Sequence, residues 1–187
     1  MATQEQQQAF LAKIIPLAQA DMKKTKILAS LTIAQAILES GWGLSGLTLR
    51  SNNLFGIKGK GVSSATFEYI NGKRVDITDN FKAYPDWATS VADHSGLFQR
   101  LARYKNLIGC TDYKQACRNV QADGYATAPN YATSLIKLIE QYKLYQYDAT
   151  KTYRITFPAL STKGEAESIK QWVQAKAKYN CIIEEEV

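Results

Sequence analysis

Apolar residues recur at helical spacing in several segments of the chain. The most apolar segment covers residues 27–40, and its spacing of four, three and four predicts a helix whose apolar stripe packs into a core. Glycine at position 41 favours the left-handed conformation that ends such a helix. The same periodicity predicts helices over residues 3–24, 87–101, 111–122 and 131–145, the first kinked or divided at Pro16. The stripe of the 27–40 helix comprises Ile27, Leu31, Ala34 and Leu38.

The pattern changes from helical to alternating over residues 65–78. Two β-rich runs there flank Asn71-Gly72, the pair that a tight type I′ hairpin turn prefers. A two-residue turn pairs Glu68 with Val75 and places the Glu68 carboxylate on the more apolar face of the hairpin. Residues 49–61, just before, lack a helical period and are predicted to form a loop. The body of the chain is therefore predicted to be α+β, mainly helical with one β-hairpin.

The pattern changes again after Asp148. An alternating run, an amphipathic helical run over 165–179 and a short apolar run at the end together predict a βαβ module. So short a unit cannot bury a core of its own. We therefore expect two domains, residues 1–148 and 149–187. The second would pack against the first, pair with a second copy to form a homodimer, or belong to a larger module.

Composition and charge narrow the range of functions. The chain of 187 residues has a formal net charge of +6, but its basic residues are scattered, which argues against nucleic-acid binding. His94 is the single histidine, and the three cysteines lack metal-ligand spacing. These features argue against a zinc site, a disulfide framework and a Ser-His or Cys-His hydrolase. We expect no metal and no cofactor.

The sequence also bears on membranes and export. No apolar run approaches the roughly 20 residues of a membrane span. The N-terminal residues "MATQEQQQAF" lack the basic and apolar regions of a secretory signal. These features predict a protein that is made in the cytoplasm and does not insert into a membrane.

One carboxylate, Glu39, lies in the last turn of the apolar helix. The negative end of the helix dipole disfavours an ionised carboxylate, and the nearby Trp42 can shield it from water. Both effects favour the protonated form, which suits a general acid near neutral pH. The alternative is a solvated glutamate at a helix end. Glu39 and Glu68 together would supply the pair of carboxylates that glycoside hydrolysis commonly uses. The distance between these two carboxylates would distinguish an inverting from a retaining mechanism.

Five ordered segments extend this interpretation. They read "TIAQAILESGWGLS", "SNNLFGIKG", "TFEYINGK", "FKAYPDW" and "GYATAPNYA". In this order they resemble glycoside hydrolase family 73, the N-acetylglucosaminidases of the bacterial cell wall, over roughly residues 8–147. The resemblance implies a lysozyme-like fold for this part of the chain and a peptidoglycan glycan strand as the substrate.

The resemblance also implies roles for individual residues. Glu39 matches the general acid that protonates the glycosidic oxygen, and Glu68 matches a hairpin carboxylate proposed as a base or electrostatic stabiliser. Tyr125 matches a tyrosine that orients the substrate or stabilises the transition state. The chain departs from the family's "YATDP" at Ala128, where an aspartate would tighten the loop that holds this tyrosine. Three further aromatic residues lie in segments that match the glycan cleft: Phe55, Tyr84 and Tyr131.

The resemblance implies an endo-β-N-acetylglucosaminidase that cleaves the β-1,4 bond between N-acetylglucosamine and N-acetylmuramic acid. The substrate's own 2-acetamido group could replace Glu68 in the reaction. The alternatives are a lytic transglycosylase of the same fold, which leaves a 1,6-anhydro sugar, and a non-catalytic glycan-binding or phage structural protein. Without an export signal, the enzyme would resemble a phage endolysin; a secreted enzyme whose signal had been removed would look the same.

Overall fold

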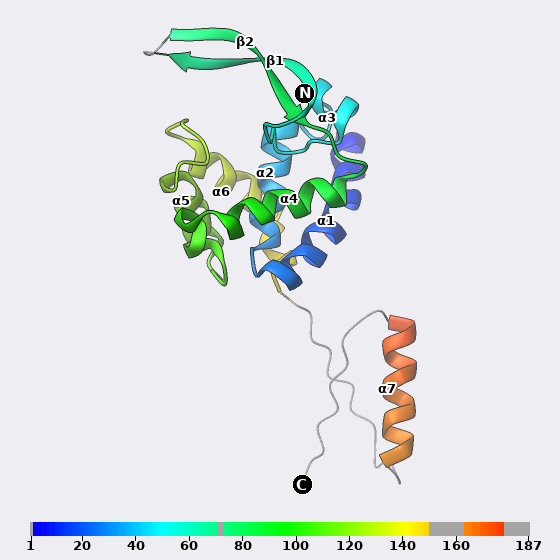
Figure 1. Ribbon diagram of the computed structural model, residues 1–187. Helices are drawn as coiled ribbons and strands as arrows, with labels where there is room; N and C mark the ends of the chain where they lie inside the picture. Colours follow the sequence, from blue (N-terminus) through cyan, green and yellow to red (C-terminus); the bar gives the residue numbers. More distant parts are fainter. Residues whose placement is uncertain (1, 71–72, 150–162, 178–187) are drawn as a thin grey trace. The chain divides into compact units, whose positions relative to one another are not determined.

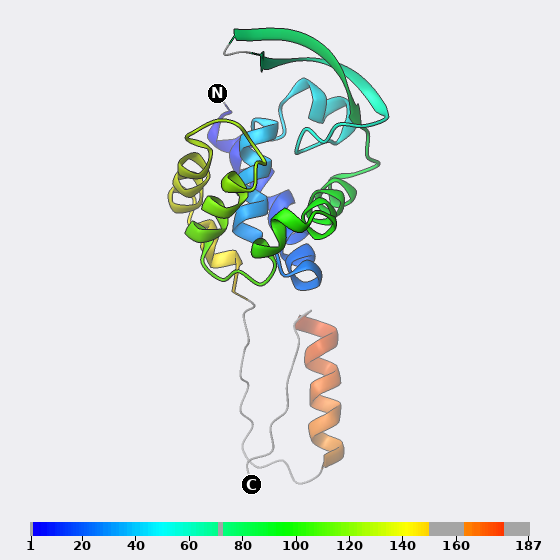
Figure 2. The same ribbon diagram turned by 60° about the vertical axis from the view of Figure 1, so that its left-hand side comes forward.

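The helix that carries Glu39, α2 (Ala29–Ser40), forms the centre of the fold. Ten of its 12 residues are buried, so protein surrounds it on nearly all sides rather than along one stripe. The computed structural model describes residues 2–70, 73–149 and 163–177. It packs α2 against α1 (Gln4–Thr25), α5 (Tyr113–Ala122) and α6 (Tyr131–Gln141), as Figures 1 and 2 show.

The chain divides into two compact units, Met1–Asp148 and Ala149–Val187. In the described part of the first unit, all the predicted helices are present, and the fold is mainly helical with a two-stranded antiparallel sheet. The short helix α3 was not predicted, because six residues are too few to display a helical period. The remaining elements of this unit are α3 (Gly46–Ser51), β1 (Gly61–Ile70), β2 (Lys73–Lys82), α4 (Trp87–Arg100) and the 3₁₀ segments η1 (Ala102–Leu107) and η2 (Leu144–Tyr147).

Helix α1 runs without interruption for 22 residues, through Pro16. A capping box closes its N-terminus: the Thr3 hydroxyl accepts the N–H of Gln6 at 3.2 Å, and the Gln6 side chain accepts the N–H of Thr3 at 2.9 Å. Phe10 and Ile14 lie on its buried face. Pro16 therefore does not divide the helix.

The predicted apolar stripe of the central helix is confirmed only in part. Leu31 and Ala34 are fully buried and Leu38 is 40% exposed; Ile27 is buried too, but it precedes α2 and does not belong to the helix. Helical spacing shows which residues share a face, whereas it does not show where along the axis the covering elements end. Glu39 is exposed as well. The C-terminal turn of α2 is thus the point at which the central helix reaches the surface.

The hairpin of β1 and β2 extends from the helical body as a long arm (Figure 1). The strands pair antiparallel from Gly61 opposite Lys82 onward, and the predicted pairing of Glu68 with Val75 is confirmed. Each strand has ten residues, so the hairpin is longer than the alternating pattern indicates. The turn residues 71–72 and the side chains of residues 66–77 lie outside the described part of the chain.

In the second unit the structure describes α7 (Lys163–Ala177), at the position of the predicted amphipathic helix. The two strands predicted to flank it lie outside the described residues, so the βαβ module stays a prediction. Trp172 on α7 is 64% exposed. This unit therefore presents a large aromatic side chain on the one element that can be described.

The structure also shows the state of the cysteines and of the side chains that could bind a metal. Cys110 and Cys117 are free thiols, and Cys181 lies outside the described residues. Within residues 2–70, 73–149 and 163–177, no group of three or more His, Cys, Asp or Glu side chains could hold a metal ion. The described helices include none with both the length and the apolar character of a membrane span.

Candidate active site

Glu39 lies directly before a sharp change of chain direction. Gly41 caps α2 in the left-handed conformation, with φ of 56°. The hydroxyl of Ser40 accepts the N–H of Gly43 at 2.7 Å and closes the turn. Gly43 also has a positive φ of 76°, and a Cβ there would lie 3.0 Å from two aromatic side chains. The two glycines of "ESGWG" therefore determine where α2 ends, and Glu39 lies in its last turn, at the surface of the core.

The carboxylate of Glu39 has a buried tyrosine as its partner. Tyr131, the first residue of α6, donates its hydroxyl to Glu39 Oε1 at 2.8 Å. The same hydroxyl accepts a hydrogen bond of 3.1 Å from Gln35 Nε2, one turn earlier on α2. Gln35 is fully buried and Tyr131 is 5% exposed. This chain of hydrogen bonds joins α2 to α6 and holds the acid in one orientation.

Burial raises the pKa of Glu39 above the usual value for glutamate, and the hydrogen bond from Tyr131 lowers it in part. The Glu39 side chain is nevertheless exposed to solvent. Both statements hold when protein surrounds the carboxyl group on most sides and solvent reaches it from one side. A raised pKa keeps the group protonated to higher pH, which is what a general acid needs.

The direction of this pKa shift agrees with the sequence argument, which did not predict the contact with Tyr131. The ring of Trp42, in the helix-ending turn that follows Glu39, packs edge-on against Phe10 at 5.8 Å and Tyr142 at 4.9 Å between ring centroids. The side chain that contacts the carboxylate is Tyr131, from a segment 92 residues away. A contact over such a sequence distance has no local signal.

Tyr125 lies in the connection between α5 and α6 and is partly exposed. Its ring stacks on that of Tyr131, with centroids 5.9 Å apart and an interplanar angle of 26°. Burial raises the pKa of Tyr125 well above its usual value, and the negative charge of Glu39 raises it further. The hydroxyl therefore stays protonated at any ordinary pH. Tyr125, Tyr131 and Glu39 form one cluster.

The other two predicted cleft residues differ from each other in exposure. Tyr84, between β2 and α4, is partly exposed, and its hydroxyl donates to Asp93 at 2.8 Å. Phe55 is only 4% exposed, and its ring stacks on His94 with centroids 3.8 Å apart. This placement favours a packing role for Phe55 over stacking on a sugar.

The structure gives the position of Glu68 in its strand but does not describe its side chain. Glu68 lies in β1 opposite Val75, seven residues from the base of the hairpin at Gly61. Its side chain lies outside the described part of the chain, and so does the separation of the two carboxylates. The structure thus brings together Glu39, Tyr125 and Tyr131, and it places Glu68 on an arm that leaves the same body.

Sequence reasoning gave two buried polar residues, Gln35 and His94, no place in this region. Gln35 interrupts an otherwise small and apolar run of α2, which was the available signal. His94 is fully buried between the rings of Phe55, Phe98 and Tyr125. Burial lowers its pKa to about 3, so the imidazole is neutral and cannot serve as an acid near neutral pH.

Comparison with known proteins gives a consistent result for the first unit. A family model described as mannosyl-glycoprotein endo-beta-N-acetylglucosaminidase matches residues 15–144. The chain is 41% identical over 153 residues to the exo-glucosaminidase LytG of Bacillus subtilis, which covers 77% of this chain and 54% of that protein. It is 33% identical to the peptidoglycan hydrolase FlgJ of Escherichia coli strain K12, over 81% of this chain and 52% of that one. The chain thus spans about half the length of the curated relatives it matches.

A solved structure shares the fold over most of the chain. The catalytic domain of the autolysin Auto from Listeria monocytogenes superposes with a TM-score of 0.72 at 36% sequence identity. The superposition covers 79% of this chain and 90% of that domain. The similarity thus extends over most of the described residues.

Proposed function

The chain belongs to the mannosyl-glycoprotein endo-beta-N-acetylglucosaminidase family, and on this premise we propose that it hydrolyses the glycan strands of bacterial peptidoglycan. The names of its relatives, a glucosaminidase, a peptidoglycan hydrolase and an autolysin, support this substrate. The bond we assign is the β-1,4 bond between N-acetylglucosamine and N-acetylmuramic acid, cut within the strand. The enzyme would act on the cell wall.

The observation that carries this proposal is the state of Glu39. It is a carboxylic acid with a raised pKa, held by Tyr131 and open to solvent. In the proposed reaction it donates its proton to the glycosidic oxygen as the bond to the sugar breaks. Tyr125, which remains protonated beside it, would donate a hydrogen bond to the substrate or to charge that develops in the transition state.

As the glycosidic bond breaks, positive charge develops on the sugar, and a nucleophile must attack its anomeric carbon. We assign Glu68 either to stabilise this charge or to act as the base that activates an attacking water. The 2-acetamido group of the substrate could be the nucleophile instead of water. Tyr84 is proposed to contact the glycan strand, because its ring is partly exposed on the same side of α4 as the base of the hairpin.

Analysis of the products tests the proposal. Purified peptidoglycan is digested, the new ends are reduced with borohydride, and the fragments are identified by mass spectrometry. We expect N-acetylglucosamine at the new reducing ends, in fragments longer than a monosaccharide. Release of single sugars would indicate an exo-acting enzyme, as the name of LytG states for that relative. Anhydro ends would identify a lytic transglycosylase, and an absence of new ends would indicate a non-catalytic glycan-binding protein.

For the second unit we propose self-association through residues 149–187. The exposed Trp172 on α7 favours this, because a large aromatic ring in solvent is a common centre of a protein interface. Two copies would present two catalytic units to an insoluble polymer and so raise avidity. Light scattering of the full chain, with a chain ending at Asp148 as control, tests it. A full chain that stays monomeric at micromolar concentration would rule it out.

A further inference from the structure

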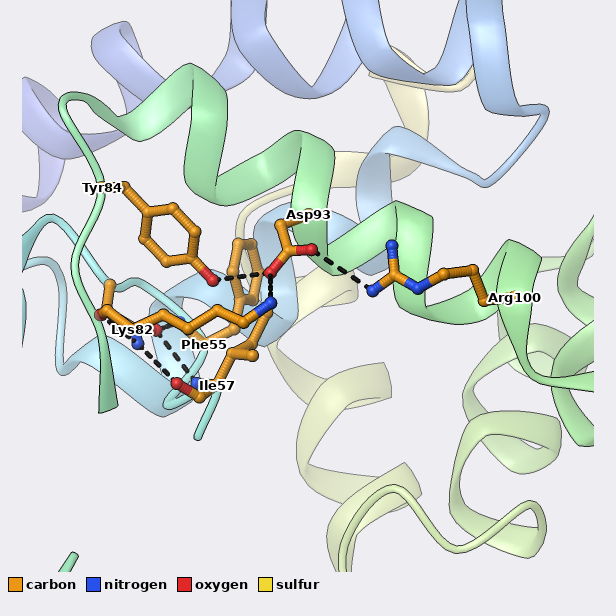
Figure 3. Close-up of polar contacts among 7 residues, drawn as sticks. Phe55, Ile57, Lys82, Tyr84, Asp93 and Arg100 are labelled. Atoms are coloured by element: carbon orange, nitrogen blue, oxygen red, sulfur yellow. Dashed lines mark hydrogen bonds and ion pairs between the residues drawn. The ribbon is translucent and has the colours of Figure 1, made fainter. Parts of the chain in front are cut away.

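Two sets of contacts tie the base of the hairpin to the helical body. In the main chain, Lys82 donates its N–H to the carbonyl of Ile57 at 2.9 Å and accepts the side-chain amide of Asn53 at 2.9 Å. In the side chain, its ammonium group lies 2.7 Å from Asp93 on α4. Figure 3 shows the contact between Lys82, the last residue of β2, and Asp93. The side-chain contact is the one that reaches a long helix.

Asp93 collects three donors on one carboxylate. Its Oδ2 accepts from Lys82 at 2.7 Å and from the Tyr84 hydroxyl at 2.8 Å, and its Oδ1 accepts from Arg100 at 3.3 Å (Figure 3). Two of these donors come from the hairpin and from the segment that follows it, whereas Arg100 belongs to the same helix as Asp93. The Asp93 side chain is 19% exposed, so these charge-assisted contacts are less screened than ion pairs on an open surface.

The length of the arm amplifies any change at its base. Lys82 is paired with Gly61, and Glu68 lies seven residues further along β1. At a rise of about 3.3 Å per residue, this separation is about 23 Å, and a rotation of about 10° at the base would move Glu68 by about 4 Å. Misplacement of a reacting group by about 1 Å can already reduce a rate by about 100-fold.

We infer that Asp93 is a positioning residue for hydrolysis: by holding Lys82 and Tyr84 against α4, it sets where the hairpin presents Glu68 to the substrate bound at Glu39. The inference rests on the proposed function, because it gives Glu68 a part in the reaction. It assigns no contact between Asp93 and the substrate.

Helix α4 connects the contacts of Asp93 with the hairpin to the cluster of Glu39, Tyr125 and Tyr131. His94, the next residue, stacks on Phe55 at 3.8 Å and contacts the edge of the Tyr125 ring at 5.7 Å between centroids. One dipeptide of α4 therefore contacts the base of the hairpin through Asp93 and the tyrosine cluster through His94. Because both contacts come from adjacent residues of α4, this helix can hold the hairpin at a fixed position relative to the cluster of Glu39, Tyr125 and Tyr131.

The test uses Asp93→Asn, which keeps the shape of the side chain and removes its charge. Arg100→Gln is the matched control, because it also deprives the carboxylate of a cationic partner but cuts no link to the hairpin. Lys82→Met is a second variant that keeps the aliphatic stem of the lysine. Hydrogen exchange is measured at the amides of Lys82 and Gly59, which bond to Ile57 and Asn80. We expect exchange at least about tenfold faster in Asp93→Asn and Lys82→Met and unchanged in Arg100→Gln.

Kinetics on peptidoglycan then tests the link to Glu68. We expect kcat to fall by about 10- to 100-fold in Asp93→Asn with a smaller change in KM. In a Glu68→Gln background the same substitution should cost little more, since the group that it positions is already gone. Full additivity of the two substitutions, or unchanged exchange in Asp93→Asn, would overturn the inference. Faster exchange in a protein that does not cut peptidoglycan would support the anchor and refute the proposed function.

Discussion

The Tyr131 hydroxyl donates a hydrogen bond of 2.8 Å to the carboxylate of Glu39 and accepts one of 3.1 Å from Gln35. A hydrogen bond to the charged form of a carboxylate opposes the effect of burial on its pKa. Tyr131 thus limits how far burial raises the pKa of Glu39, and it also orients the acid from the neighbouring helix. The acidity and the position of Glu39 depend on the same contact.

We predict that Glu39→Gln folds normally and loses nearly all activity on peptidoglycan. The amide keeps the shape of the side chain but has no transferable proton, and general acid catalysis typically contributes about 10²–10⁴-fold. The rate of clearing of purified peptidoglycan and the melting temperature are the two measurements. Glu140→Gln, an exposed glutamate on α6, is the control and should retain activity. Activity within a few-fold of the wild type would contradict the role of Glu39.

Tyr131→Phe should move the alkaline limb of the pH–rate profile to higher pH. The substitution removes the hydrogen bond that lowers the pKa of Glu39, so the acid stays protonated further into the alkaline range. The profile of kcat/KM against pH measures this shift. Because the buried Gln35 also loses its acceptor, we expect a loss of stability of about 1–3 kcal/mol.

A matched control for Tyr131→Phe is Tyr142→Phe. That hydroxyl is likewise hydrogen-bonded to a neutral glutamine, to which it donates (Gln7 Oε1, 3.1 Å), but it has no contact with Glu39 among the described hydrogen bonds. Its alkaline limb should coincide with that of the wild type. A shift to lower pH in Tyr131→Phe would show that the hydroxyl raises rather than lowers the pKa of the acid.

The hairpin and the site show what local sequence can predict. The sequence predicts a two-residue turn at Asn71-Gly72, and such a turn pairs Glu68 with Val75; this pairing of the two strands is found in the structure. The end of α2 at Gly41 followed in the same way from the conformational freedom of glycine. These features depend on residues that are close in sequence.

The remaining parts of the site depend on contacts between distant segments. Phe55 was expected on a glycan-binding surface, yet it is buried against His94, 39 positions away in the chain numbering. Asp93 carries no feature in its own helix that distinguishes it from a solvated aspartate, and only packing brings Lys82 and Tyr84 to it. Periodicity indicates which face of an element is apolar, but not which partner covers it.

His94 should make stability depend on pH in the acidic range. Burial lowers its pKa from 6.5 to about 3, so between these values the unfolded chain binds a proton that the folded chain does not. The free energy of unfolding therefore falls as the pH is lowered from about 6.5, by up to about 1.4 kcal/mol per pH unit. Neither ring nitrogen has a hydrogen-bond partner among the described residues, so His94→Phe should remove this dependence without losing a contact of that kind.

Urea unfolding of both proteins at pH 7 and pH 5 measures the effect. Other groups titrate in both chains, so the difference between the wild type and His94→Phe isolates the histidine. We expect the wild type to lose about 2 kcal/mol more than the variant over this interval. Parallel losses would show that the pKa of His94 in the folded protein is close to its value in the unfolded chain.

Asp148 is predicted to stabilise the opposite end of the helix that carries Glu39. The N-cap residue of α2, Leu28, has no capping side chain, and Asp148 supplies one from the end of the first unit. Its carboxylate accepts the N–H of Ser30 at 2.7 Å and the Ser30 hydroxyl at 2.6 Å. A carboxylate at this position also interacts favourably with the positive end of the helix dipole.

We therefore expect Asp148→Ala to lower the free energy of unfolding by about 1–2 kcal/mol, as loss of an N-cap does elsewhere. Asp148→Asn retains one side-chain acceptor and should lose less, which separates hydrogen bonding from the effect of charge. Thermal melts of the three proteins give the comparison. The kcat of Asp148→Ala should stay within about twofold of the wild type below its melting range, because α2 remains packed along its length and Tyr131 still holds Glu39. A fall in kcat at unchanged stability would mean that the end of the first unit acts on the site itself and not through the helix cap.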